Sequence, residues 1–204
     1  MERPWLQLPS EPIYVTDGQV ALECCERIMS TSSSVDGAPF ACGFDLEWPI
    51  TYEQGTQASV TVMQLCVRTE DDTYECFVFQ LSKIGLPPCL RRLMSAKRLI
   101  KVGLNISNDI EKLARDFDAD MPCDYIVRHS AADLSALANQ VLNTNEQWSL
   151  SGLCVNVLKH QLDKTTRASD WAACPLSSEQ ITYAALDAYA SLRIYEVLMQ
   201  RKTR

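Results

Sequence analysis

The sequence predicts an α/β fold, in which flanking helices cover a mixed central sheet that contains an antiparallel meander. Three observations favour this fold. Three strand-like segments lie close together in the first half, strand-like and helix-like segments alternate in the second half, and a long helical segment ends the sequence. No Gly-x-Gly-x-x-Gly motif or Gly-Lys-Ser/Thr phosphate loop occurs, so neither a dinucleotide-binding fold nor that route to nucleotide hydrolysis is indicated.

The N-terminal part is expected to be peripheral to the sheet. Residues 1–12 contain several prolines and are predicted to form a loose lead-in. A short strand is predicted at 13–15, followed by a helix at roughly 18–30 that Asp17 caps. A polar loop at 30–38 then leads to the meander.

The meander is predicted from composition. Its strands are expected at 40–47, 59–68 and 74–81, because these segments are rich in β-branched, aromatic and apolar residues. The connection at 69–73 is short and polar, which is typical of a hairpin between antiparallel strands.

The second half is predicted to alternate between strands and helices. The cap of its second helix is expected at Ser107 or Asn108, and Ser177 with Gln180 fits a capping box before the last helix. No internal repeat indicates a second domain, so residues 1–204 are expected to form one domain. The predicted strands are 98–105 and 124–127, and the predicted helices are 87–95, 107–117, 131–142, 149–160 and 178–200.

Composition and charge restrict the class of protein. Apolar residues make up 47% of the chain and charged residues 22%, which is typical of a globular protein and not of a disordered one. The nine cysteines form no Cys-x-x-Cys pair, which favours reduced thiols in an intracellular protein. No apolar run approaches the roughly 20 residues that cross a bilayer.

The net charge of −7 is unevenly distributed. Residues 1–80 carry 3 Lys and Arg against 13 Asp and Glu, whereas residues 81–204 carry 16 against 13. A net negative chain argues mildly against nucleic-acid binding, because phosphates attract Lys and Arg. An acidic part joined to a basic part is compatible with a site that binds cations and a polyanion together.

The segment Gly43-Phe44-Asp45-Leu46-Glu47-Trp48 places two acids in an apolar strand. Residues i and i+2 of a strand point to the same face, so Asp45 and Glu47 should lie side by side. Two adjacent carboxylates repel each other, and a divalent cation such as Mg²⁺ or Mn²⁺ would offset that cost. The alternative is a half-exposed strand whose polar face meets water.

Two further acids occupy helices. Asp109 is expected in the first turn of a helix that directly follows a strand, where the helix dipole alone would also favour a carboxylate. Tyr183 and Asp187 are four residues apart on the last helix and share a face, where a hydrogen-bonded pair without further role is the alternative. The set of four acids and a tyrosine, taken together, predicts a metal site.

These motifs resemble the three exonuclease motifs of the DEDD superfamily, in the subgroup that has Tyr in the last motif. The resemblance is greatest to the exonuclease domain of Werner syndrome helicase and its stand-alone homologues. It extends from about residue 13 to residue 200. It rests on GFDLEW, GLNISND with LARDFD, WSLSGL at 148–153, RASDW at 167–171, and LSSEQITYAALDAYA at 176–190.

The resemblance implies a ribonuclease H-like, DnaQ-like fold and two-metal hydrolysis of phosphodiester bonds. Two Mg²⁺ or Mn²⁺ ions would be the cofactors, and Asp45 would bridge them. Glu47 and Asp187 would complete the site of the nucleophile-side ion, and Asp109 would hold the second ion through water. Tyr183 would orient the attacking water, and the product would be a nucleoside 5′-monophosphate.

The resemblance also implies substrates and partners. The expected substrate is DNA with a 3′ end, as a single strand or a recessed duplex end, and the expected setting is DNA repair or replication in the nucleus. A RecQ-type helicase is an expected partner, in cis or in trans. A ribonuclease D-like RNA 3′ exonuclease and a catalytically inactive nucleic-acid-binding scaffold are the alternatives. The expected substrate contacts are Leu46, Trp48, Arg167 and Trp171, and ordinary core packing is the alternative for Trp171.

Overall fold

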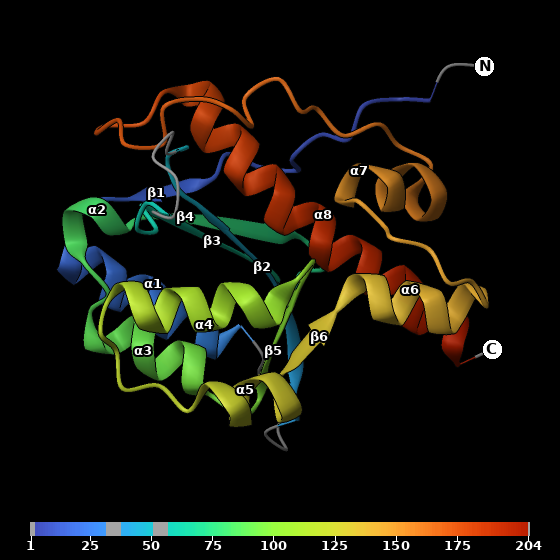
Figure 1. Ribbon diagram of the computed structural model, residues 1–204, viewed down its shortest axis with the longest axis horizontal. Helices are drawn as coiled ribbons and strands as arrows, with labels where there is room; N and C mark the ends of the chain where they lie inside the picture. Colours follow the sequence, from blue (N-terminus) through green and yellow to red (C-terminus); the bar gives the residue numbers. More distant parts are fainter. Residues whose placement is uncertain (1–2, 32–37, 51–56, 204) are drawn as a thin grey trace.

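A computed structural model describes residues 3–31, 38–50 and 57–203. In this part of the chain six strands form one sheet in the order β1-β4-β3-β2-β5-β6, with helices on both of its faces (Figure 1). The strands are β1 (Ile13–Val15), β2 (Phe40–Glu47), β3 (Val62–Arg68), β4 (Tyr74–Gln80), β5 (Leu99–Gly103) and β6 (Ala131–Asp133).

The sheet is mixed, as predicted. Strands β2, β3 and β4 are antiparallel neighbours and form the meander, whereas β1 runs parallel to β4. On the other side β5 is parallel to β2, with Phe40 opposite Leu99 and Gly43 opposite Val102, and β6 is parallel to β5. The C-terminal end of β2 therefore extends beyond β5, and that end carries Asp45 and Glu47.

Helices cover both faces of the sheet (Figure 1), and a layer of buried apolar side chains lies on each face. Helices α1 (Gly18–Ser30), α3 (Pro88–Ser95), α4 (Ile106–Asp116) and α5 (Cys123–His129) contribute buried residues to the first layer. Helices α6 (Leu134–Leu142), α7 (Leu150–Leu153) and α8 (Ser178–Lys202) contribute to the second. Two short elements, α2 (Leu81–Ile84) and the π-helix η1 (Cys154–Leu158), complete the described secondary structure.

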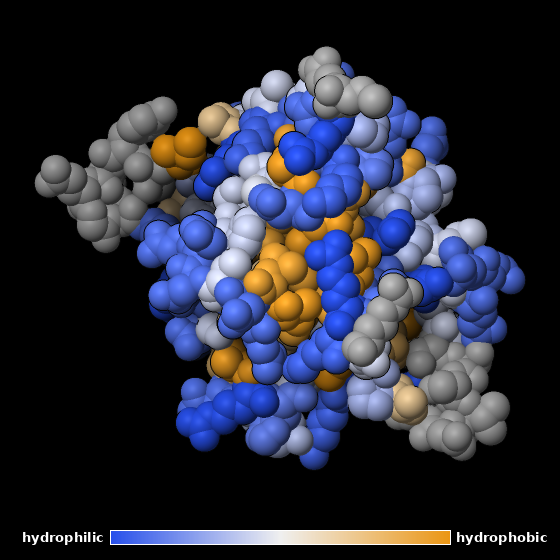
Figure 2. All heavy atoms as spheres, turned by 90° about the vertical axis from the view of Figure 1, so that its right-hand side faces the viewer, coloured by the Kyte–Doolittle hydropathy of each residue, from blue (hydrophilic) through white to orange (hydrophobic). Residues whose placement is uncertain are grey.

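Figure 2 shows the side of the molecule where α6, α7 and the C-terminal end of α8 lie. Apolar atoms gather in the centre of this side, and polar atoms surround them. The half-buried apolar side chains on these elements include Leu137, Val141 and Val197, which pack against the second layer. No helix among the described residues is both long and apolar enough to span a membrane.

Two predicted helix caps are confirmed. The Asp17 carboxylate accepts hydrogen bonds from the backbone N–H groups of Gln19 and Val20, which α1 leaves without intrahelical partners. Ser177 and Gln180 form the reciprocal capping box at the start of α8. The cap of α4 differs from the prediction, because it is Asn105, in a left-handed conformation with φ of 53° and without a side-chain capping bond.

The lead-in is not loose in its described part. Leu6 N–H donates to the Gln161 carbonyl, Gln161 N–H donates to the Pro4 carbonyl, each at 2.8 Å, and the Ser10 hydroxyl donates to the Tyr74 carbonyl. Leu6 and Leu8 also pack on the second apolar layer. The segment is held because it supplies backbone bonds and apolar contacts that a peripheral loop would lack.

Three further segments differ from their predicted structure. The strand predicted at 124–127 is wrong, because helix α5 occupies it and the strand at this edge is β6. The helix predicted at 149–160 is divided into α7 and η1, which starts at Cys154. The loop predicted at 30–38 lies mostly outside the described residues.

Candidate active site

The carboxylates of Asp45 and Glu47 share one face of β2, as their spacing predicts. Their neighbours Phe44 and Leu46 are 1% and 4% exposed and point into the first apolar layer. Asp187 approaches the same face from α8, and one carboxylate oxygen from each of the three acids lies within 4.8 Å of the others. Residues that are far apart in the sequence therefore form one acidic cluster.

A glycine brings α8 this close to the strand. Gly43 lies two residues before Asp45, and a Cβ atom at Gly43 would lie 1.9 Å from the Ala188 carbonyl oxygen. Most of the residues that α8 buries around Asp187 are small, among them Ala184, Ala185 and Ala188. Small residues on both elements let the helix backbone pack directly against β2 and bring Asp187 to the other two acids.

The acidic cluster lies in a cleft of about 820 Å³. Asp109 also lines the cleft, although it is outside the cluster of three acids that lie within 4.8 Å. Four other residues predicted to act in the site also line the cleft, namely Leu46, Trp48, Arg167 and Tyr183.

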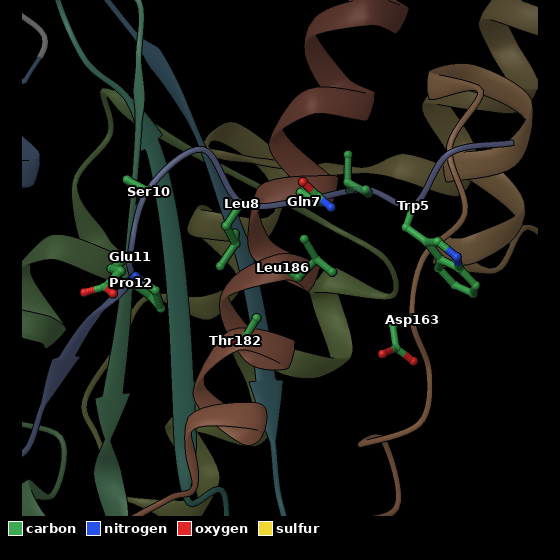
Figure 3. A pocket seen from close by; sticks show the side chains of 10 residues that line it. Trp5, Gln7, Leu8, Ser10, Glu11, Pro12, Asp163, Thr182 and Leu186 are labelled. Carbon is green, nitrogen blue, oxygen red and sulfur yellow. The ribbon is translucent and has the colours of Figure 1, made fainter.

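A second pocket, of about 560 Å³, lies between the N-terminal segment and α8 (Figure 3). Its lining includes Trp5, Leu8 and Leu186, and its charged residues are Glu11 and Asp163. None of the four predicted metal ligands lines it. All four predicted metal ligands line the larger cleft instead.

Burial and mutual repulsion disfavour ionisation of the acids. Burial raises the pKa of Asp45 to about 6, against weaker opposition from hydrogen bonds. Burial, followed by the neighbouring Asp45 and Asp187, raises the pKa of Glu47 to about 9. Burial and Asp45 also raise the pKa of Asp109 to about 8 and that of Asp187 well above its usual value, so the metal-free cluster retains protons near neutral pH.

The donor atoms of the cluster fit a divalent cation. The Asp187 Oδ1 atom is buried and has no hydrogen-bond partner among the described residues, an arrangement that costs stability unless something binds the atom. The cluster offers only oxygen ligands, which Mg²⁺ and Mn²⁺ prefer. A bound cation would satisfy the orphaned oxygen and offset the repulsion among the carboxylates.

Tyr183 stands beside the acids as a protonated hydroxyl. Burial raises the pKa of Tyr183, and the nearby Asp187, Glu47 and Asp45 raise it further. Trp171 packs against the Tyr183 ring, with 5.9 Å between the ring centroids, and its indole N–H donates to the Arg167 carbonyl. Trp171 is 1% exposed and is not among the residues that line the cleft, so it supports Tyr183 from the core, and the substrate contact expected of it stays a prediction.

Two exposed cations also line the cleft. Arg167 lowers the pKa of Asp45, Glu47 and Asp187 through its positive charge, although burial outweighs this effect at each acid. Lys164, which the sequence did not single out, lies three residues earlier and acts on Asp187 in the same direction. The cleft therefore presents positive charge next to the acids, as a site for an anionic substrate requires.

Gln64 is a site residue that sequence reasoning missed. It is fully buried on β3 directly opposite Asp45, and its Nε2 donates to Asp45 Oδ2 at 3.2 Å. The sequence does contain a sign of this role, because Gln64 is the single amide among the apolar residues of β3, where a buried polar side chain needs a specific partner. Gln64 thereby fixes the orientation of one acid of the cluster.

Comparison with solved structures defines the class of fold. The EXO domain of Nibbler from Aedes aegypti aligns with a TM-score of 0.75 at 22% identity, over 98% of this chain and 92% of that one. RNase D from Escherichia coli aligns with a TM-score of 0.68 at 19% identity, over 95% of this chain and 46% of that one. The chain thus has the ribonuclease H-like fold of exonuclease domains.

Sequence comparison then defines the family. A family described as 3′-5′ exonuclease matches residues 12–202. The bifunctional 3′-5′ exonuclease/ATP-dependent helicase WRN of Mus musculus is 37% identical over 198 residues, which are 96% of this chain and 13% of that protein. A 3′-5′ exonuclease of Drosophila grimshawi is 33% identical over 98% of this chain and 60% of its own length. The chain belongs to the 3′-5′ exonuclease family, and it spans less than two thirds of these relatives.

Proposed function

We propose that this chain is a divalent-metal-dependent 3′→5′ exodeoxyribonuclease that releases nucleoside 5′-monophosphates from the 3′ end of DNA. The observation that carries the proposal is the convergence of Asp45, Glu47 and Asp187 within 4.8 Å in a cleft that also exposes Arg167 and Lys164. An acidic cluster that binds cations, next to basic side chains that bind phosphate, suits a phosphodiester substrate.

The four acids have distinct proposed roles. Asp45, Glu47 and Asp187 would hold one Mg²⁺ or Mn²⁺ ion, because their oxygens converge. Asp109 and Asp45 would hold a second ion, and the position of Asp109 outside the tight cluster suits a contact through water. Two such ions, when bound, activate a water and stabilise negative charge on the leaving 3′-oxygen.

The remaining residues position the reactants. Tyr183 keeps its proton because its pKa is raised, so it would donate a hydrogen bond and orient the attacking water without acting as a base. Arg167 and Lys164 would bind the phosphates of the terminal nucleotides. Leu46 and Trp48 line the cleft next to the acids, so they would contact the terminal sugar and base.

The resemblance of the motifs to the exonuclease domain of Werner syndrome helicase favours DNA as the substrate, and the mouse relative combines a 3′-5′ exonuclease with an ATP-dependent helicase. It also supports the wider setting that we propose, namely DNA repair or replication in the nucleus with a RecQ-type helicase in cis or in trans. The structural neighbours favour RNA as the second candidate, because they include RNase D of Trypanosoma brucei in complex with RNA U12.

Digestion of matched strands separates the two substrates. We would incubate 5′-labelled DNA and RNA of the same sequence with the protein and Mn²⁺, and compare kcat/KM for the two. We expect DNA to be degraded from its 3′ end with the larger kcat/KM. A larger value for RNA would replace the DNA assignment with the RNA exonuclease, and no degradation of either strand would favour the inactive scaffold.

A further inference from the structure

Helix α4 carries a buried ammonium group next to the proposed active site. Lys112 is 4% exposed, and it lies three residues after Asp109 on the same side of the helix. Lysine is almost never fully buried unless it is paired, since its charge loses hydration there. A buried Lys112 therefore requires specific partners.

Three groups surround the Lys112 ammonium. Its Nζ donates to the Ala58 carbonyl and to Asp116 Oδ2, each at 2.7 Å, and it lies 4.9 Å from the centroid of the Trp48 ring. An ammonium has three N–H donors, so two bonds and one cation–π contact use its full capacity. Trp48 is the member of this group that lines the cleft.

The Lys112–Asp116 pair is poorly explained by helix stability. In an (i, i+4) pair the favourable order places the acid before the base, whereas here the base comes first. The pair is also buried, with side-chain exposures of 5% and 10%, so its desolvation offsets much of the attraction between the charges. The ion pair instead fixes the position of the Lys112 ammonium next to the Trp48 ring.

The Asp116 carboxylate also binds the chain at a residue that follows Trp48 in the sequence. Asp116 Oδ2 also accepts a hydrogen bond from Val60 N–H at 3.0 Å. Lys112 and Asp116 thus connect α4 both to the residue that directly follows Glu47 and to the segment 58–60 that enters β3. Trp48 thus follows the strand that carries Asp45 and Glu47, and its half-buried indole packs against the first apolar layer and against Lys112 of the helix that carries Asp109.

We propose that Lys112 is a positioning residue, which holds the Trp48 indole in place as a stacking surface for the base of the 3′-terminal nucleotide. The inference rests on the proposed nuclease function, and it assigns to Lys112 a role in substrate binding and none in the chemical step. A single aromatic ring stacks on any of the four bases, so this contact would bind the terminal nucleotide without reading sequence.

The first experiment separates binding from chemistry. KM and kcat are measured on a 5′-labelled DNA strand with Mn²⁺ for the wild type, Lys112→Met, Lys112→Arg and Trp48→Ala. We expect Lys112→Met and Trp48→Ala to raise KM about tenfold, with kcat within about twofold, since one base–aromatic stack contributes roughly that factor to affinity. Lys112→Arg should restore most of the loss, and the double variant Lys112→Met/Trp48→Ala should be no worse than Trp48→Ala.

The matched control is Lys97→Met. Lys97 lies 5.0 Å from the Tyr125 ring, a contact of the same kind in a part of the fold that does not line the cleft. This variant should leave KM and kcat unchanged. A fall in kcat at constant KM for Lys112→Met, or additive effects in the double variant, would overturn the proposal.

Binding to a strand without a terminal base tests the stacking directly. With Ca²⁺ replacing Mn²⁺ to prevent hydrolysis, Lys112→Met should weaken binding of an ordinary strand, and should not affect a strand that ends in a tetrahydrofuran abasic residue. Equal weakening for both strands would contradict the proposal. Failure of the nuclease function would show separately, as a wild type that degrades no strand. The contribution of Trp48 to the tryptophan fluorescence, obtained by difference from the Trp48→Ala variants, would still report whether Lys112→Met releases the indole.

Discussion

Strand β2 presents chemically opposite faces to the two apolar layers of the molecule. On one face Cys42, Phe44 and Leu46 are buried in the first apolar layer. On the other face Asp45 and Glu47 lie near Asp187. Alternate residues of one strand thus pack in the apolar core on one side and form the acidic cluster on the other.

The two faces of β2 contribute oppositely to the stability of the fold. A buried apolar face gains free energy from every methylene removed from water, about 0.8 kcal/mol each. The acidic face holds carboxylates with raised pKa values and an orphaned Asp187 oxygen. The account predicts that changes to the acidic face trade activity against the stability of the metal-free protein.

Removal of charge from the acidic face should have the largest effect. We expect Asp187→Asn to lower kcat by more than about a thousandfold, because it removes a proposed metal ligand. We also expect the metal-free variant to unfold at a higher temperature than the wild type at pH 8, because a buried carboxylate and its repulsion with Asp45 are gone. The exposed Asp120→Asn should change neither quantity, and retained activity in folded Asp187→Asn would remove Asp187 from the site.

Loss of space between β2 and α8 should be the next largest effect. The Cβ atom introduced by Gly43→Ala would meet the Ala188 carbonyl at 1.9 Å, so the helix must move away from the strand. We expect a loss of about 3 kcal/mol or more in the free energy of unfolding, together with weaker Mn²⁺ binding. Gly18→Ala is the matched control, because nothing lies within 4 Å of its added Cβ, and equal stability of the two variants would contradict this packing.

Removal of the amide opposite Asp45 should have a smaller effect on metal affinity. Gln64→Leu keeps the approximate volume of the side chain but deletes the bond from Nε2 to Asp45 Oδ2. We expect calorimetry to show a dissociation constant for Mn²⁺ that is about 10- to 100-fold higher, the usual consequence of losing a residue that orients a metal ligand. An unchanged dissociation constant would show that Asp45 needs no such support.

The smallest predicted effect is a dependence of stability on pH. The pKa values of Asp45, Glu47 and Asp109 are raised to about 6, 9 and 8, so between pH 5 and 8 the folded protein binds more protons than the unfolded chain. The free energy of unfolding of metal-free protein should therefore fall as pH rises through this range, by a few kcal/mol per pH unit at most (about 1.4 for each extra proton that the folded protein binds). Urea unfolding with EDTA measures this slope, which should flatten in Asp45→Asn and reverse with excess Mn²⁺.

The members of the acidic cluster were predictable one by one from local periodicity, whereas their convergence was implied by the resemblance to the exonuclease motifs. The two-residue repeat of a strand places Asp45 beside Glu47, and the apolar surroundings of Asp187 on a long helix place that residue inside. The meander and the capping box at Ser177 also follow from short-range patterns. These features depend on residues near one another in the sequence.

The features that sequence reasoning missed depend on distant partners. Ala131 to Asp133 have little strand propensity, and they form β6 because β5 pairs with them, whereas the β-branched Ile126 and Val127 lie in a helix. The burial of Trp171 follows from its contact with Tyr183, and that of Lys112 from its contacts with Ala58 and Trp48. Such contacts appear only when the fold brings the segments together.

The most direct test of the account is digestion of a 5′-labelled duplex that has a recessed 3′ end, with Mn²⁺ or with EDTA. The account predicts a ladder of products shortened from the 3′ end with Mn²⁺, and no products with EDTA or with Asp187→Asn. A ladder that persists in EDTA, or label released at once as a short 5′ fragment, would contradict a metal-dependent 3′→5′ exonuclease built on Asp45, Glu47 and Asp187.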